Sequence, residues 1–196
     1  MSKKKLIFLI FVLILLAGGA SIGPIMSNVE TPKYKILTSK GNIEVRRYSP
    51  LIIAEVEVYG DRRTTIGDGF RVLADYIFGN NAMETKIEMT APVQQKGKDQ
   101  SWKINFVMPS NFSLKDLPTP IDKRVRLKTI SERHYAVIKF TGRNSDDNIS
   151  YHEKELKNYF SQHYHSSIPL PIYAFYNPPR TLPFLRRNEI LIEIPH

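Results

Sequence analysis

The sequence contains no cysteine among its 196 residues. This absence excludes disulfides, cysteine-ligated zinc, iron–sulfur clusters, thiolate-ligated cofactors, a lipidated N-terminal cysteine and a cysteine nucleophile. Tryptophan is also scarce, with one residue, yet 42% of the residues are hydrophobic and 11% are aromatic. Such a composition is typical of a globular protein and not of a disordered or fibrous one.

Familiar catalytic motifs are missing as well. There is no glycine-rich phosphate loop, no dinucleotide fingerprint and no Gly-x-Ser-x-Gly elbow. His152-Glu153 does not begin a zinc-binding helix, because Leu156 stands where the second histidine would be. Asp146-Asp147 lie at an expected helix start, where carboxylates cap the helix and oppose its dipole. We therefore expect a protein that is not an enzyme.

Basic residues outnumber acidic ones, 28 to 19, for a net charge of +9. Three lysines in the first 28 residues account for part of that excess, which leaves +6 for residues 29–196. The other basic residues are spread along the chain, whereas nucleic-acid binding favours a dense basic stripe with aromatics. We expect a solvated surface, or one that faces an anionic envelope, and no nucleic-acid partner.

The first 28 residues form a separate segment. Lys3-Lys4-Lys5 precede an apolar run from Leu6 to Ala17, and small residues follow through Ala20. This pattern fits an export signal cleaved after Ala20. The span from Leu6 to Met26 is also just long enough for an uncleaved membrane anchor, and a buried soluble helix is a third interpretation. Both leading interpretations place residues 29–196 outside the cytoplasmic membrane, secreted or membrane-anchored.

Residues 29–109 predict an initial hairpin followed by strand, helix, strand and strand. Gly41-Asn42 is the hairpin turn, and the helix lies between Gly60-Asp61 and Gly79-Asn80. One face of this helix carries apolar residues at 4-3-4 spacing, namely Ile66, Phe70, Leu73 and Ile77. The expected strands are Tyr34–Leu37, Ile43–Tyr48, Leu51–Val58, Lys86–Gln94 and Trp102–Met108.

The second half repeats the same order. Its helix is expected from about Ser145 to Tyr164, and its strands are Arg124–Ile130, His134–Phe140, Ile172–Tyr176 and Ile190–Ile194. We interpret this order as two pseudo-repeats, about 43–109 and 124–195, within one domain of residues 29–196. Two such units predict an α+β fold with a cleft beneath the helices, and we expect a monomer.

Two features of the helices have competing explanations. Gly67 and Gly69 in the first helix indicate either tight packing on the sheet or room for a flat ligand to approach the backbone. His152 and His163 lie on the apolar stripe of the second helix. Each is either an ordinary boundary residue with a satisfied hydrogen bond or an axial ligand for a haem iron.

Two widely separated segments carry a more specific signature. The first is Lys86–Val93, which contains Met-Thr-Ala-Pro-Val, and the second is Tyr176–Ile190, which contains Asn-Pro-Pro and Arg-Arg-Asn-Glu. Together with Trp102–Pro109, these blocks resemble the SOUL haem-binding family in order and spacing, from about Tyr34 to Ile194. The resemblance implies a duplicated βαββ fold that forms a distorted eight-stranded antiparallel barrel with two helices.

The resemblance also implies a function. Family members bind haem or other tetrapyrroles non-covalently in a shallow apolar cleft beside the first helix. The corresponding groove positions are Ile66 and Phe70, with Leu73 one turn on, and we extend this set to Ile77 and Met89. Arg186 and Arg187 are candidate partners for the haem propionates, or else anchors of a long turn. No histidine matches a family motif position, so His152 and His163 stay weak axial candidates.

These observations leave three hypotheses. The first is a non-catalytic tetrapyrrole binder that buffers or carries haem in the envelope, and a binder of another hydrophobic small molecule is its variant. The second is an enzyme acting on tetrapyrroles, with Glu88, Asp75 and Tyr76 as the nearest acid–base candidates. The third is a module that presents an aromatic surface to a partner protein. The first hypothesis accounts for most of the motif residues named above.

Overall fold

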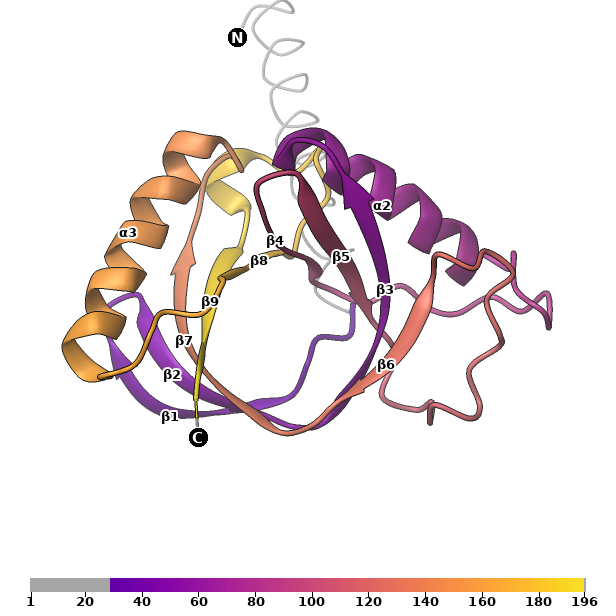
Figure 1. The fold of residues 1–196 in the computed structure, drawn as a ribbon, viewed down its shortest axis with the longest axis horizontal. Helices are drawn as coiled ribbons and strands as arrows, with labels where there is room; N and C mark the ends of the chain where they lie inside the picture. Colours follow the sequence, from indigo (N-terminus) through magenta and orange to yellow (C-terminus); the bar gives the residue numbers. More distant parts are fainter. Residues whose placement is uncertain (1–28, 196) are drawn as a thin grey trace, which may run out of the picture.

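The computed structural model describes residues 29–195, which form a curled antiparallel sheet with two helices on its outer side (Figure 1). The expected leader, residues 1–28, lies outside the described part. The elements are β1 (Tyr34–Lys40), β2 (Ile43–Tyr48), β3 (Leu51–Tyr59), α2 (Arg62–Ile77), β4 (Val93–Lys98), β5 (Ser101–Val107), β6 (Arg126–Ile130), β7 (Arg133–Phe140), α3 (Asp146–His163), β8 (Ile172–Phe175), η2 (Pro183–Leu185) and β9 (Asn188–Ile194).

The strand order is β1-β2-β7-β9-β8-β4-β5-β3-β6. The α+β class with two helices is as predicted from the sequence. The distorted eight-stranded barrel that the resemblance implies is wrong, because the sheet has nine strands and ends in two edges, β1 and β6. β1 is the additional strand, since it pairs with β2 alone through the hairpin at Gly41. The result is an open half-barrel.

The two halves of the chain exchange their leading strands. β2 precedes β3 in sequence but pairs with β7, while β6 precedes β7 but pairs with β3. The halves also meet where β4 pairs with β8. Each half-sheet therefore contains a strand from the other half, so neither half completes its sheet alone.

The predicted strand Lys86–Gln94 is displaced along the chain. The structure places β4 at Val93–Lys98, and residues 86–92 are irregular. Pro92 explains the difference, because proline has no N–H to donate to a ladder, so regular pairing begins after it. The irregular segment is held instead by specific bonds, including Thr90 Oγ1 to the Val107 carbonyl at 2.6 Å.

Helix α2 begins and ends next to the residues that its sequence predicts as start and stop signals. Asp61 caps it by accepting hydrogen bonds from the Arg63 and Thr64 backbone N–H groups. The hydrogen bond from the Thr64 hydroxyl, with help from these N–H groups, holds the pKa of the Asp61 carboxyl below its ordinary value. The helix ends before Gly79, which has a φ of +116°.

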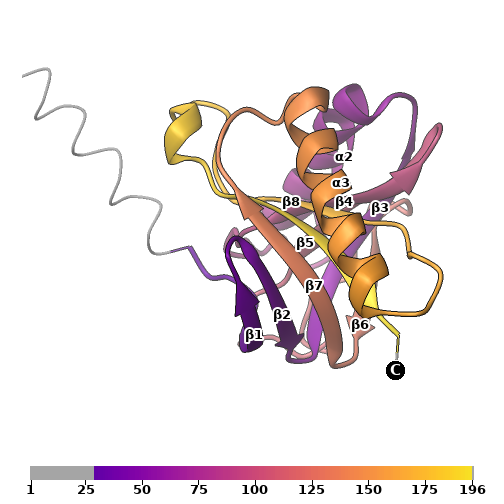
Figure 2. The ribbon, with the colours of Figure 1, turned by 90° about the vertical axis from the view of Figure 1, so that its left-hand side faces the viewer.

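α2 packs against β3 and β5, and α3 packs against β7 and β9 (Figures 1 and 2).

The two glycines of α2 differ in their surroundings. A Cβ on Gly69 would lie 2.3 Å from Ile104 Cγ1, so this glycine permits close helix–sheet packing. A Cβ on Gly67 would meet nothing within 4 Å. The packing explanation therefore holds for Gly69, while Gly67 leaves the helix surface flat.

This difference predicts opposite effects of alanine on stability. Gly67→Ala should raise the free energy of unfolding by about 0.5–1 kcal/mol, because an interior helical glycine is replaced without a clash. Gly69→Ala should lower it by about 1–3 kcal/mol through overpacking against Ile104. Urea denaturation of both variants checks the pair, and a stabilised Gly69→Ala protein would contradict the packing observed here.

Alternation along the strands divides the sheet into two faces. On β3, Ala54 and Val56 join the core under α2, while Ile53 and Glu55 face the concave side of the half-barrel. A second core lies under α3, and a third cluster on the concave side includes Tyr48, Tyr135 and Leu191. The side chains beneath both helices are thus part of packed cores.

An ionic cluster is buried beside the concave side. Arg46 donates to both carboxylate oxygens of Glu189, at 2.9 and 3.1 Å, and both side chains are fully buried. Glu189 also accepts from the Tyr176 hydroxyl at 2.8 Å and from Arg187 at 2.8 Å. Tyr48 accepts a further bond from Arg46 at 2.9 Å. The cluster ties β2 to β9 and to the end of β8.

Buried tyrosines predict a loss of stability in alkali. Burial raises the pKa of Tyr76 and of Tyr135 to about 12, above the value of about 10 in an unfolded chain. Because the folded state resists deprotonation, the stability is fully present below about pH 10 and falls as the pH rises toward 12. Denaturant melts at neutral pH and about pH 11 should show the loss, with tyrosinate absorbance appearing together with unfolding. Equal stability at both pH values would contradict this.

Candidate ligand-binding surfaces

The predicted haem residues on α2 divide into core and surface. Leu73 and Ile77 are 0% and 1% exposed and belong to the core between α2 and the sheet. Neither reaches solvent, because the space expected beneath the helix is filled by side chains. Ile66 and Met89 are half-buried and pack against the same core. Phe70 remains 39% exposed, with its ring edge-on to Phe106 at a centroid distance of 5.3 Å.

Phe70 belongs to a surface that we name the α2 outer flank. It consists of Arg63, Ile66, Gly67 and Phe70. Arg63, Gly67 and Phe70 follow one another at i, i+4 and i+7, so they share one side of the helix. Arg63 is exposed, and its guanidinium has no partner among residues 29–195. Its spacing from Gly67 and Phe70 is the signal in the sequence that points to it.

Arg186 and Arg187 are engaged within the protein. Arg186 donates to the Thr181 carbonyl at 2.8 Å and to the Pro179 carbonyl at 2.5 Å, which fixes the loop before β9. Arg187 pairs with Glu189 and lies over the Tyr176 ring at 3.9 Å. A propionate would have to compete with these bonds, so both arginines have structural roles here.

The two candidate axial histidines lie on α3 and bond to their own helix. His152 Nδ1 lies 2.7 Å from the Asn148 carbonyl oxygen, and its ring stacks on Phe140. His163 Nδ1 lies 2.8 Å from the Tyr159 carbonyl oxygen, and its ring stacks on Tyr159. Nε2 is therefore the nitrogen that each has left for a ligand. Within residues 29–195, no group of three or more His, Asp or Glu side chains is placed to hold a metal ion.

The acid–base candidates do not form a reaction centre. The Tyr76 hydroxyl is buried and donates to the Pro118 carbonyl at 2.9 Å. Its pKa is raised to about 12 by burial, so it stays protonated and committed to that bond. Asp75 accepts from Asn80, while Glu88 is exposed on the irregular segment.

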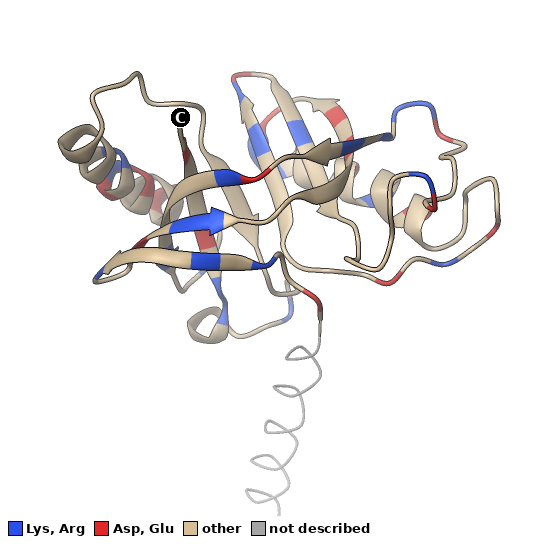
Figure 3. Ribbon diagram, turned by 90° about the horizontal axis from the view of Figure 1, so that it is seen from below, with Lys and Arg blue, Asp and Glu red and all other residues tan. Residues whose placement is uncertain are grey.

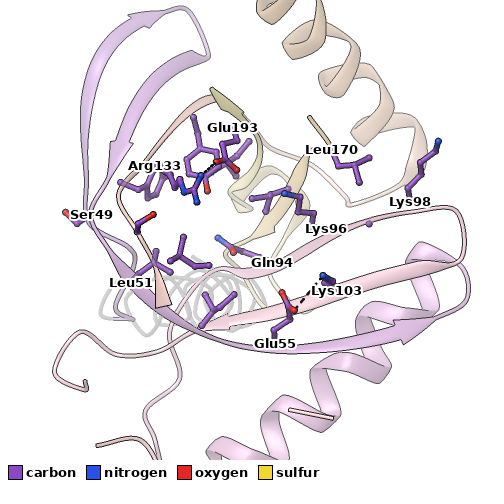
Figure 4. A pocket seen from close by; sticks show the side chains of 18 of the residues that line it. Ser49, Leu51, Glu55, Gln94, Lys96, Lys98, Lys103, Arg133, Leu170 and Glu193 are labelled. Atoms are coloured by element: carbon purple, nitrogen blue, oxygen red, sulfur yellow. Dashed lines mark hydrogen bonds and ion pairs between the residues drawn. The ribbon is translucent and has the colours of Figure 1, made fainter. Parts of the chain in front are cut away.

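A cavity of about 500 Å³ opens on the concave side of the sheet (Figure 4). We name it the concave-face cavity. None of the predicted haem residues lines it, because α2 lies on the other face. It is missed by sequence reasoning because its wall takes alternate residues from strands throughout the chain. Those residues are Tyr48, Ser49, Leu51, Ile53, Glu55, Gln94, Lys96, Gly97, Lys98, Ser101, Lys103, Ile130, Ser131, Arg133, Tyr135, Leu170, Ile172, Leu191 and Glu193.

Charged residues are distributed over the strands and not gathered into one stripe (Figure 3). Several basic side chains are paired, for example Lys128 with Glu55 at 2.6 Å and Lys157 with Glu153 at 2.5 Å. Arg62 of α2 also pairs with Asp146 of α3, which joins the two helix starts. No helix among the described residues is long and apolar enough to cross a membrane.

The fold and these surfaces define a class: an α+β domain with a curled nine-stranded antiparallel sheet, an exposed aromatic ring on its first helix and a concave cavity. Comparison with known proteins identifies the family. Residues 29–193 match the SOUL heme-binding protein family, and the chain belongs to it. This confirms the resemblance carried by Met-Thr-Ala-Pro-Val, Asn-Pro-Pro and Arg-Arg-Asn-Glu.

Among curated proteins, the chain is 31% identical to Heme-binding protein 2 of Homo sapiens over 136 residues. The match covers 63% of this chain and 66% of that protein, just under two thirds of its length. Among solved structures, the EcmrR C-terminal domain has a TM-score of 0.58 at 10% identity, covering 82% of this chain and 96% of that one. A hydrolase from Listeria innocua has a TM-score of 0.53 at 11% identity, covering 80% and 93%. Both structural likenesses show the fold alone.

Proposed function

We propose that the protein binds haem or another tetrapyrrole on the α2 outer flank. The observation that carries this proposal is Phe70, which presents an exposed ring beside the flat, open surface of Gly67 on the first helix. Membership of the heme-binding family and the name of the human relative support a tetrapyrrole as the ligand. Within the flank, Ile66 is half-buried and packs against the core that contains Leu73 and Ile77, and Met89 packs against the same core.

The flank offers the two interactions that a haem needs. One face of the macrocycle lies over Gly67 and Phe70, where burial of apolar area contributes roughly 25 cal/mol per Å². Arg63 is available to a propionate through a charge-assisted hydrogen bond. Association entropy offsets much of this gain, so we expect a dissociation constant on the order of micromolar without an iron–protein bond.

We further propose that the bound haem is stored or handed on, and not transformed. The committed Tyr76 hydroxyl and the scattered carboxylates support a non-catalytic role. The basic and apolar leader, residues 1–28, supports a location outside the cytoplasmic membrane, with the protein secreted or anchored. We propose that it is a monomer there. Fractionation of cells with antibody to the protein tests this location, and recovery with cytoplasmic markers would refute it.

Titration with haemin, followed by Soret absorbance, tests the proposed ligand and surface together. We expect a saturable shift in the wild-type protein and about tenfold weaker binding, or ~1.4 kcal/mol, in Phe70→Ala and Gly67→Leu. Gly67→Leu should fold well, because its side chain enters open space. Tyr151→Ala, which removes an aromatic ring that is 69% exposed on α3, is the matched control and should bind normally. No saturable shift at tens of micromolar (about −6 kcal/mol) would overturn the proposal.

A further inference from the structure

We propose that the concave-face cavity is a second ligand site, which takes an amphipathic organic carboxylate of the fatty-acid type. The cavity is separated from the α2 outer flank by the sheet, so this inference does not depend on haem binding. Its volume of about 500 Å³ lies within the range of small-molecule sites, about 300–1,000 Å³.

On the side of Leu51, part of the cavity wall is apolar, and the paired Arg133 and Glu193 lie on the same side (Figure 4). Leu51 begins β3 and pairs with Ile130 at the end of β6, and Ile53 follows on the same side of β3. Tyr48 and Leu191, which belong to the concave-side cluster, continue this wall across the sheet. An acyl chain placed here would bury its methylenes against aliphatic and aromatic side chains.

The other end carries the excess of positive charge. Lys96 and Lys98 lie two residues apart on β4, so they share one face of the strand. Lys96 lies directly opposite Lys103 of β5 in the strand register, so a third ammonium group is a cross-strand neighbour of the first. In Figure 4 the lysines and Leu51 lie at opposite ends of the cavity.

The carboxylates in the cavity already have cationic partners. Glu55 accepts from Lys128 at 2.6 Å and lies 4.0 Å from Lys103. Glu193 is paired with Arg133. Lys96 and Lys98 have no ion-pair partner in the described part of the chain. Two ammonium groups without a counter-ion at one end of an apolar cavity favour an anionic head group.

Two polar groups without partners point to the same ligand chemistry. The Gln94 side chain projects into the cavity in Figure 4 and makes no hydrogen bond within residues 29–195. Tyr135 also lines the cavity, and its hydroxyl makes no hydrogen bond within the described residues. A carboxylate oxygen in the cavity could accept a hydrogen bond from this hydroxyl and from the Gln94 amide.

The test compares two probes that carry a twelve-carbon chain and head groups of opposite charge, both with the full-length protein. Isothermal titration with dodecanoate should give saturable binding at least tenfold tighter than titration with dodecyltrimethylammonium. Lys96→Gln combined with Lys98→Gln should weaken dodecanoate binding about tenfold or more. Lys35→Gln combined with Lys40→Gln removes the same charge from β1, outside the cavity, and should leave binding within about twofold.

The outcomes separate this site from the haem surface. Phe70→Ala should bind dodecanoate normally, and haemin should not displace it. Equal affinity for the cationic probe, wild-type binding by the Lys96/Lys98 double variant, or loss of dodecanoate binding in Phe70→Ala would each overturn the proposal. Circular dichroism of the double variant confirms that it is folded, since both lysines lie on β4 without ion-pair partners to lose among the described residues.

Discussion

Replacing Glu189 with leucine is expected to lower the free energy of unfolding by about 3–5 kcal/mol, because the buried Arg46 guanidinium then keeps only the partly exposed Glu44 as an ionic partner in the described part of the chain. The guanidinium of Arg46 is fully buried and donates two of its hydrogen bonds to Glu189. Tyr176 and Arg187 would lose an acceptor in the same variant. Urea denaturation measures the change in stability.

A double variant tests whether Glu189→Leu loses stability through the buried charge of Arg46 or through altered packing. Arg46→Met combined with Glu189→Leu removes both buried charges and should recover most of the stability lost in Glu189→Leu. Arg187 is partly exposed, so its guanidinium can turn toward water when Glu189 is absent. A Glu189→Leu protein within about 1 kcal/mol of wild type would show that the buried pair is not formed as described.

Leu73→Ala is expected to lower the free energy of unfolding by about 2–5 kcal/mol while leaving haemin affinity unchanged. Leu73 is completely buried between α2 and the sheet, so truncation creates a cavity in the core and removes no surface contact. Denaturation and Soret titration of the same protein sample measure the two properties separately.

Phe70→Ala is the matched comparison, one turn away on the same helix. It should weaken haemin binding about tenfold but cost less stability than Leu73→Ala, because Phe70 is partly exposed already. If Leu73→Ala reduced haemin affinity in the folded protein and Phe70→Ala did not, the ligand would lie beneath α2 and not on its outer flank.

Much of the fold follows from local patterns. The 4-3-4 spacing from Ile66 to Ile77 predicts α2, and the alternating segments predict the strands apart from the displaced β4. Pairing is different, because the exchange of β2 and β6 between the two halves depends on contacts far apart in sequence. Periodicity also cannot tell which end of an apolar stripe is covered, so Phe70 and Leu73 are equivalent in the sequence and different in the structure.

The buried cluster and the cavity were missed for the same reason. Arg46 is one of the scattered basic residues that the sequence predicts on a solvated surface, and its partner Glu189 is 143 residues away. The concave-face cavity has no linear motif, since its residues come from eight strands and the segments that connect them. The alternation of Gln94, Lys96 and Lys98 on one face of β4 is the local signal that was present.

Paramagnetic broadening of backbone amide signals by haemin measures directly whether the tetrapyrrole binds at the α2 outer flank. Haemin iron broadens the signals of nearby nuclei, so the amides of Arg63, Gly67 and Phe70 should lose intensity first on titration into the full chain. Amides of β4 and β9 that line the concave-face cavity should be affected least. Broadening confined to those strands, or spread evenly over the protein surface, would contradict binding at the α2 outer flank.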